Sequence, residues 1–302
     1  MILPVAHVRV SSRRVWILGQ AVALMLSSGI ADAQSGARLG VNHVYGYLDS
    51  TSYDALAASA FVRDTLGTVR QATVSDARSS WSGLYLFGRT TYLEFYRAGP
   101  ATPPPGTFAI AFGGDEPGAL DAARARLAGR GVAAAITSRR RPVGADTIPW
   151  FRQLSPGSAD SAAIAPAARW WVMEYDEGYL ARRPPGDPTL EGRVDRETYN
   201  RPLYRPELWL RDVAGLTLRL APGPRAALLR QLEALGFERD RSGGAARFRT
   251  ADIEIALEDA GTERAGLAEV RLAVAAAAPP IRRQLGGVRF ASAGGVAYLR
   301  LP

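Results

Sequence analysis

Apolar and polar positions along the chain follow one order of elements that recurs four times: an apolar strand, a helix, and then two or three further strands. The first unit opens with a predicted strand over Gly40–Asp49, whose alternation continues through Val44, Tyr45 and Tyr47. A helix is predicted over Tyr53–Leu66. Three strands rich in aromatic and β-branched residues complete the unit, over Val69–Val74, Trp81–Arg89 and Tyr92–Arg97.

The second unit repeats this order. Its first strand, Gly106–Asp115, again runs ten residues from Gly to Asp, and the helix Ala119–Leu127 carries apolar residues at helical spacing. Strands are predicted over Val132–Thr137, Ile148–Leu154 and Arg169–Tyr175. We therefore expect two βαβββ units within residues 34–180.

The third unit has a strand over Val213–Leu220, a helix over Arg225–Leu235, and strands over Ala245–Phe248 and Ile253–Leu257. The fourth, Gly266–Pro302, is a shortened copy that ends in the strand Val296–Leu301. Units one and three match locally, since Arg89–Phe95 and Arg249–Ile255 both end in a Glu between two apolar residues. Residues 181–207, rich in Pro and charges, are predicted to be a linker before a second domain over 208–302.

The N-terminus has the pattern of a secretory signal peptide. Arg9, Arg13 and Arg14 precede an apolar run over 15–30, and the run ends at the small-residue motif Ala31-Asp32-Ala33. The run is shorter than the roughly 20 residues of a spanning helix, so a retained membrane anchor is the weaker interpretation. We expect cleavage after Ala33 and a periplasmic or secreted protein without a membrane span, exported by the Sec or the twin-arginine route.

Composition narrows the chemistry. The chain has 302 residues and no Cys, which excludes disulfides, thiolate metal sites and Cys nucleophiles. All 37 basic residues are Arg, so lysine chemistry is excluded as well. The net charge is +8, but the Arg residues are mixed with Asp and Glu along the chain, so no nucleic-acid partner is expected. Cleavage would remove His7 and leave His43 as the last histidine.

Two short motifs carry a family resemblance: Asn42-His43-Val44 in the first strand, and Thr91–Phe95 some fifty residues later. With the paired βαβββ units, they resemble the vicinal oxygen chelate superfamily of glyoxalase I, bleomycin-resistance proteins and extradiol dioxygenases. The likeness is nearest to its bacterial glyoxalase-like domains of unknown function. It implies an α+β fold in which paired βαβββ modules form cupped mixed sheets, here as two tandem domains of which the second is degenerate.

The resemblance also implies a metal site, because the family holds a metal from the first and last strands of each unit in a pair. On this chain those positions are His43 and Glu94 in the first unit, and Ala109 and Glu174 in the second. His43, Glu94 and Glu174 are ligand types that suit a divalent metal ion. By analogy with the family, Glu174 would also serve as the proton-transferring catalytic base.

Other interpretations of these residues remain open. Glu94 could pair with Arg97 and Glu174 with Arg169, as ordinary structural ion pairs. The single histidine disfavours the dioxygenase and fosfomycin-resistance branches, which use two His and one Glu. In the second domain the corresponding positions, Gly215, Glu254, Glu269 and Arg300, place a cation where a ligand belongs, so no metal is expected there.

These observations predict an exported, glyoxalase-like metal-binding protein. It would be a divalent-metal-dependent lyase or isomerase acting on a small substrate chelated through vicinal oxygens. The alternative is a metal-free protein that sequesters a small molecule, as bleomycin-resistance proteins do; the missing ligand at Ala109 favours it. A third possibility is an interaction module of the cell envelope. A homodimer is compatible with each of them.

Overall fold

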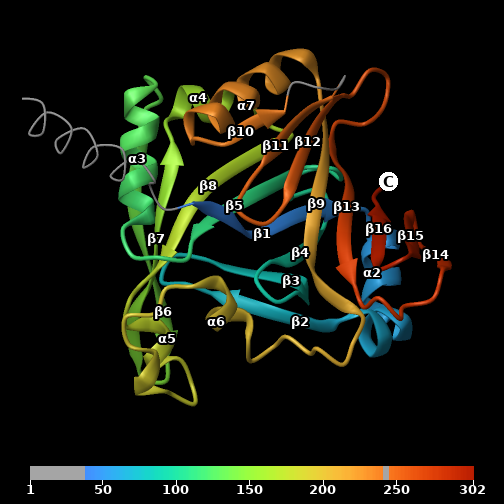
Figure 1. Cartoon of the computed structure of the whole chain (residues 1–302), viewed down its shortest axis with the longest axis horizontal. Coiled ribbons are helices and arrows are strands. Elements are labelled where there is room, and N and C mark those ends of the chain that lie inside the picture. The colour runs from blue at the N-terminus through green and yellow to red at the C-terminus, as the bar shows by residue number, and fades with distance from the viewer. Residues whose placement is uncertain (1–37, 241–244) are drawn as a thin grey trace, which may run out of the picture. The chain divides into compact units, whose positions relative to one another are not determined.

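The computed structural model describes residues 38–240 and 245–302, so the predicted signal peptide lies outside the described residues. Two eight-stranded mixed sheets form the structure, each built from two consecutive modules (Figure 1). The strand order is β2-β3-β4-β1-β5-β8-β7-β6 in the first sheet and β10-β11-β12-β9-β13-β16-β15-β14 in the second. The predicted α+β class with paired modules in two tandem sheets is therefore confirmed.

The first sheet contains the first two modules. The first module consists of β1 (Leu39–Leu48), α2 (Ser50–Ala58), the π-helical turn η1 (Val62–Leu66), β2 (Thr68–Ser75), β3 (Ser80–Phe87) and β4 (Tyr92–Arg97). The second module consists of β5 (Phe108–Gly114), α3 (Ala119–Gly129), β6 (Ala134–Val143), β7 (Asp146–Pro156), the short helix α4 (Ser158–Ala162) and β8 (Ala168–Tyr175).

The second sheet contains the other two modules. The third module consists of β9 (Leu210–Leu220), α7 (Pro222–Ala234), β10 (Glu238–Asp240), β11 (Ala246–Arg249) and β12 (Glu254–Asp259). The fourth module consists of β13 (Gly266–Val274), β14 (Ile281–Leu285), β15 (Val288–Ala293) and β16 (Val296–Arg300).

The fourth module lacks the crossover helix, and this changes its topology. In the other modules the last strand runs parallel to the first, as β4 does to β1, β8 to β5 and β12 to β9. In the fourth, β16 runs antiparallel to β13. A parallel return needs a crossover of a dozen or more residues, and residues 275–280 are too few. The chain therefore turns back at the same end of the sheet.

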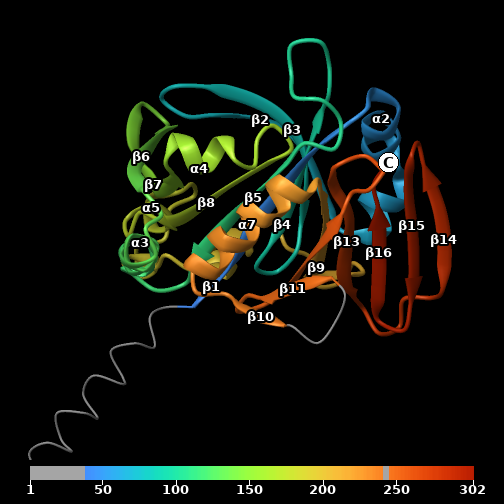
Figure 2. The same cartoon turned by 90° about the horizontal axis from the view of Figure 1, so that it is seen from above.

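Elements of the first module take the place of the missing helix. Figure 2 shows α2 beside β14 and β15. The Phe61 ring meets that of Phe290 on β15 at 5.1 Å between centroids, and the Gly287 N–H donates to the Ser52 hydroxyl at 3.0 Å. Residues from both sheets and from α2, α3 and α7 form one continuous core. The two sheets therefore bury their helix-bearing faces together.

A buried arginine joins the two sheets through the segment between them. This connecting segment, residues 176–209, contains α5 (Tyr179–Arg182), the 3₁₀ turn η2 (Pro188–Leu190) and α6 (Arg196–Asn200). Arg196 is 3% exposed; it donates from Nε and Nη2 to both oxygens of Asp115, at 2.8 and 2.6 Å. Its Nη1 donates to Asp252 of the second sheet at 2.5 Å and to the Val41 carbonyl of β1 at 2.8 Å. A Cβ at Gly40 would overlap the guanidinium group.

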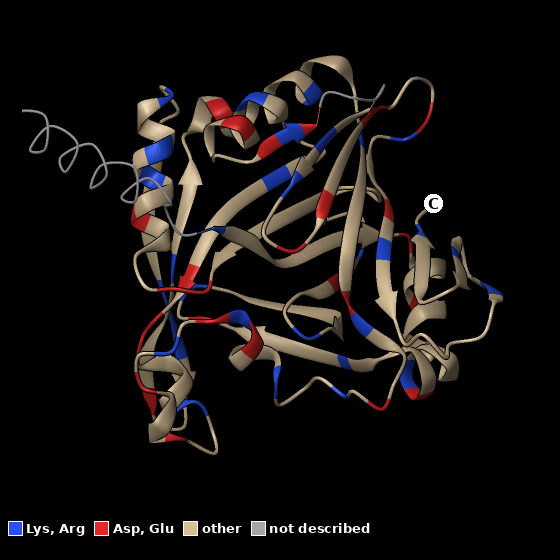
Figure 3. Ribbon diagram, in the orientation of Figure 1, with Lys and Arg blue, Asp and Glu red and all other residues tan. Residues whose placement is uncertain are grey.

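Charged residues elsewhere are mixed in sign. Figure 3 shows Arg and acidic positions interspersed along both sheets, and many of these residues form Arg–carboxylate ion pairs. Within residues 38–240 and 245–302, no helix is both long enough and apolar enough to cross a membrane.

Replacing Arg196 with Met should destabilise the fold by about 3 kcal/mol or more, because two carboxylates and a carbonyl would lose a buried partner. Urea unfolding followed by circular dichroism measures this change. Arg193→Gln is the matched control; its side chain is 60% exposed and pairs with Asp195, so we expect a change within about 0.5 kcal/mol. Equal stabilities of the two variants would show that Arg196 does not join the sheets.

Candidate functional site

The face of the first sheet opposite the core is lined with aromatic rings; we call this face the cup. On β1 the side chains of His43, Tyr45 and Tyr47 alternate onto it, each opposite a residue of β4. Those partners are Tyr92, Glu94 and Tyr96 respectively. Along β4 the alternation of side chains puts Tyr92, Glu94 and Tyr96 on the cup face, whereas Leu93 and Phe95 lie in the core.

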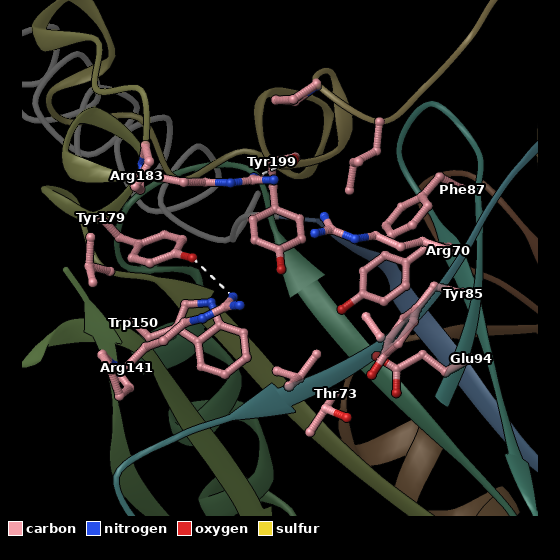
Figure 4. Close-up of a pocket in the computed structure, with 18 of the residues that line it drawn as sticks. Arg70, Thr73, Tyr85, Phe87, Glu94, Arg141, Trp150, Tyr179, Arg183 and Tyr199 are labelled. Carbon is pink, nitrogen blue, oxygen red and sulfur yellow. Dashed lines mark hydrogen bonds between the residues drawn. The ribbon is translucent and has the colours of Figure 1, made fainter. Parts of the chain in front are cut away.

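Two tryptophans divide the cup. Trp81 on β3 and Trp150 on β7 stack with 6.4 Å between ring centroids and 11° between planes. Both rings line each of two adjoining cavities, together with Tyr92 and Glu94. The larger cavity, of about 1070 Å³, contains His43, Tyr45 and Trp171 and is called the floor cavity. The smaller, of about 470 Å³, is called the arginine cavity (Figure 4).

A buried ion pair holds the two ends of the sheet together across the cup. The carboxylate of Asp76, in the β2–β3 turn, accepts from Arg139 of β6 at 2.8 Å, and the Ala77 N–H donates to the Arg140 carbonyl at 3.1 Å. Burial opposes ionisation of Asp76, but N–H groups of Arg78 and Ser79 and the charge of Arg139 outweigh it and lower its pKa. The sheet is thereby curled into a partly enclosed site.

His43 is a neutral imidazole in this site. Burial lowers its pKa to about 3. Its Nδ1 lies 2.8 Å from Oδ1 of Asn42, which accepts only, so Nδ1 carries the proton and Nε2 is the free acceptor. The Asn42 amide donates in turn to the Tyr175 hydroxyl at 3.2 Å. The ring stacks on Tyr92 with 4.8 Å between centroids.

Glu94 is a buried carboxyl group that faces rings rather than cations. It is 6% exposed, and Oε2 accepts from the Tyr96 hydroxyl. Burial raises its pKa to about 7, and the hydrogen bonds from Tyr96 and Tyr92 offset only part of that cost. Among the described residues no Arg lies within ion-pair distance of Glu94, so the predicted alternative pairing with Arg97 does not form; Arg97 pairs with Asp54. Near neutral pH this group can accept or release a proton.

The third predicted ligand, Glu174, does not lie on the face that His43 and Glu94 share. Glu174 accepts from the Leu120 N–H at 3.2 Å in the first turn of α3, and Arg152 lies 3.5 Å from its other oxygen. Side chains alternate along β8, so Trp171 and Met173 face the cup and Glu174 faces the helix. Its partner is Arg152 rather than Arg169. Glu174 thus stabilises the start of α3.

No other residue replaces Glu174 as a ligand. On β5, alternation puts Ala109 and Ala111 on the cup face, opposite Tyr45 and His43. Throughout the described part of the chain, no three His, Cys, Asp or Glu side chains are grouped so that they could hold a metal ion. His43 and Glu94 are then the two ligand-type side chains on this face, and Glu94 already accepts a hydrogen bond from Tyr96. Such a pair does not fit a divalent metal ion.

The corresponding positions of the second sheet form ion pairs. Gly215 lies opposite Glu254, and Glu269 lies opposite Arg300. Arg247 donates to Glu254 at 2.7 Å and Arg300 to Glu269 at 2.7 Å. Both carboxylates therefore have an arginine partner.

The connecting segment completes the cup with residues that the sequence analysis did not select. Tyr199 of α6 stacks on Tyr175 with 4.4 Å between centroids, and Arg183 lies 4.6 Å from the Tyr199 ring centroid. The Tyr and Arg residues between 179 and 204 could have indicated that this segment lines the cup. The segment is also rich in Pro and charged residues, and that composition is equally typical of a linker.

A family model covers most of the chain. The family of unknown function DUF5829 matches residues 41–297. The chain belongs to this family. The match spans most of both sheets and the whole connecting segment. No curated protein matches the sequence.

Solved structures resemble this DUF5829 member at low identity. A hypothetical protein from Staphylococcus aureus is 11% identical over 85% of this chain and 97% of that one, with a TM-score of 0.53. The Mn(II)-bound glyoxalase from Novosphingobium aromaticivorans is 16% identical over 86% and 81%, with a TM-score of 0.43. Homoprotocatechuate 2,3-dioxygenase from Arthrobacter globiformis is 15% identical over 74% and 61%, with a TM-score of 0.37.

These likenesses concern the fold alone. The pairing of consecutive modules into mixed sheets agrees with the fold that the sequence resemblance implied. The special likeness to glyoxalase-like domains of unknown function stays a prediction.

Replacing Glu94 with Gln should stabilise the protein above neutral pH. The folded-state pKa of about 7 lies above the ordinary 4.5, so the folded protein binds this proton more tightly than the unfolded chain. Stability therefore falls as pH rises from 4.5 to 7, by about 3 kcal/mol for this group, and Gln removes that loss. Urea unfolding of variant and wild type should differ most near about pH 8 and converge near pH 4.5.

Glu174→Gln is the matched control, since its carboxylate has an arginine and a helix N–H as partners and its loss should lower stability near about pH 8. A Glu94→Gln variant less stable than wild type at that pH would show that a bound cation, such as a metal ion, keeps Glu94 ionised.

Proposed function

We propose that this DUF5829 member binds a small aromatic or amphiphilic organic molecule in the cup of its first sheet, without a metal ion. The observation that carries this proposal is the lining of the cup: stacked tryptophans, tyrosines from β1 and β4, and one buried carboxyl group without a cationic partner. Of the functions considered from the sequence, this is the metal-free, sequestering alternative.

The size and lining of the cavities support binding of a small organic molecule. Volumes of about 470 and 1070 Å³ are in or near the range of ordinary ligand pockets. Aromatic faces provide large apolar contact areas, and a few polar groups fix the orientation of a ligand. In the cup those polar groups are the His43 imidazole, the Glu94 carboxyl and the tyrosine hydroxyls.

The residues also argue for a metal-free site. A metal-dependent lyase or isomerase needs at least three protein ligands around an open position. The cup supplies His43 and Glu94, and Ala109, Ala111 and Met173 occupy the neighbouring strand positions. The vicinal-oxygen-chelate fold is thus retained here while the ligand set is incomplete.

Mature protein should bind 2-naphthamide, a neutral aromatic probe, with the same affinity in the presence and absence of EDTA. Trp150→Leu should weaken binding about tenfold, because this ring lines both cavities and each aromatic contact contributes about 1 kcal/mol or more. Isothermal titration calorimetry measures the affinities. Tyr298→Leu is the control, since Tyr298 is 38% exposed on the second sheet.

Metal content provides the second test. Protein expressed with Mn, Fe, Co, Ni and Zn should carry far less than one ion per chain, and His43→Ala should not change that content. Stoichiometric metal that disappears in both His43→Ala and Glu94→Ala would overturn the metal-free assignment. Failure of the wild type to bind any naphthalene probe, neutral or charged, would overturn the binding function.

A further inference from the structure

The arginine cavity contains cations that lack a carboxylate partner. Arg70 of β2, Arg141 of β6 and Arg183 after α5 all line it, and Figure 4 shows Arg70 and Arg141 entering from opposite walls. Among the described residues none of the three forms an ion pair. Their neighbour Arg139, on the same strand as Arg141, is paired with Asp76. Three unpaired cations from separate elements therefore converge on one cavity.

Aromatic rings hold two of these guanidinium groups by their faces. Arg141 lies 4.8 Å from the Trp150 ring centroid, and Arg183 lies 4.6 Å from that of Tyr199. Arg141 also donates to the Tyr179 hydroxyl at 3.3 Å, and Arg183 to the Tyr199 carbonyl at 2.6 Å. A guanidinium group has five N–H donors in its plane, so these contacts leave further donors for a ligand.

Two buried polar atoms in the same lining also lack partners. The Tyr85 hydroxyl and the Trp150 Nε1 make no hydrogen bond within the described structure, although each residue is only 5% exposed. A buried unsatisfied donor is costly, and a bound ligand can satisfy it. The indole N–H donates only, so it requires an acceptor. The cavity thus offers many donors and a single carboxyl acceptor, Glu94.

Building on the proposed function, we infer that the arginine cavity binds the carboxylate of an aromatic or amphiphilic organic acid. The carboxylate meets Arg70, Arg141 and Arg183, while the flat body of the ligand lies against Trp150 and the rings of Tyr85 and Phe87. A carboxylate matches the planar fork of guanidinium donors. Glu94 in the same lining disfavours a dianion such as a phosphate ester, because like charges repel in a partly buried site.

The test compares four naphthalene probes on full mature protein by isothermal titration calorimetry: 2-naphthoate, its neutral isostere 2-naphthamide, 2-naphthyl phosphate and the cation 2-(aminomethyl)naphthalene. We expect 2-naphthoate to bind about tenfold or more tightly than 2-naphthamide, since charge-assisted hydrogen bonds exceed neutral ones. The phosphate and the cation should bind more weakly than 2-naphthoate.

The variant Arg141→Gln/Arg183→Gln should lose the preference for 2-naphthoate over 2-naphthamide. The control Arg282→Gln/Arg289→Gln removes the same charge from exposed positions of the second sheet and should behave as wild type. Rising salt should weaken naphthoate binding only modestly, because partly buried charges are screened less than exposed ones.

The outcomes separate the two proposals. If 2-naphthamide binds as tightly as 2-naphthoate, or if the double variant keeps the preference, the inference is overturned and the proposed function stands. A preference for the phosphate or for the cation overturns the inference in the same way. If none of the four probes binds, both the inference and the proposed function are overturned.

Discussion

Burial of one guanidinium group is the constraint on which the arrangement of this protein depends. Arg196 brings a full charge between the two sheets, and such a charge is tolerated only when its donors are satisfied. Asp115, Asp252 and the Val41 carbonyl satisfy it from three different elements. Burial opposes ionisation of Asp115, but its bonds to Arg196 outweigh that cost and lower its pKa. The pairing therefore needs Asp115 ionised and weakens as acid protonates it.

The position of Arg196 also fixes part of the cup. Arg196 opens α6, and Tyr199 lies one helical turn later on the same helix. Fixing Arg196 between the sheets therefore fixes the Tyr199 ring against Tyr175, and with it the Arg183 side chain that lies over that ring. A segment that holds the two sheets together also supplies one wall of the candidate site. Gly40 belongs to the same arrangement, because a side chain there would exclude the guanidinium group.

Much of the fold could be predicted from local patterns. Strand β4 has the predicted bounds, Tyr92–Arg97, because its alternating residues separate an aromatic face from a core face. His43 and Glu94, which the family resemblance assigned to the first and last strands of the first unit, lie on one face of the neighbouring strands β1 and β4. Glu174 could not be placed in this way. Strand β8 is covered on both faces, and most of its residues are buried. Its sequence therefore does not indicate which residues face the cup and which face the helix.

The connecting segment escaped prediction for a different reason. Its short helices are held by long-range bonds such as that between Arg196 and Asp115, which are 81 residues apart. Propensity and periodicity report local preferences, and a turn of four or five residues has almost none. A Pro-rich, charged composition therefore looks the same whether the segment is solvated or packed against a sheet.

Two equivalent glutamates, Glu94 and Glu254, differ in how much stability their burial costs. Glu94 and Glu254 match in the local sequence repeat and lie on the last strands of their modules, β4 and β12. Glu254 lies opposite Gly215 and Arg249, pairs with Arg247, and keeps 24% of its side chain exposed. Glu94 lies opposite Tyr45 and Tyr85 and is almost fully buried without a cation. In the second sheet this fold pairs the glutamate with an arginine, which costs little stability. In the first sheet the equivalent Glu94 is buried without such a pair. Stability lost at a single site, where aromatic rings and unpaired arginines also gather, is typical of a position kept for binding.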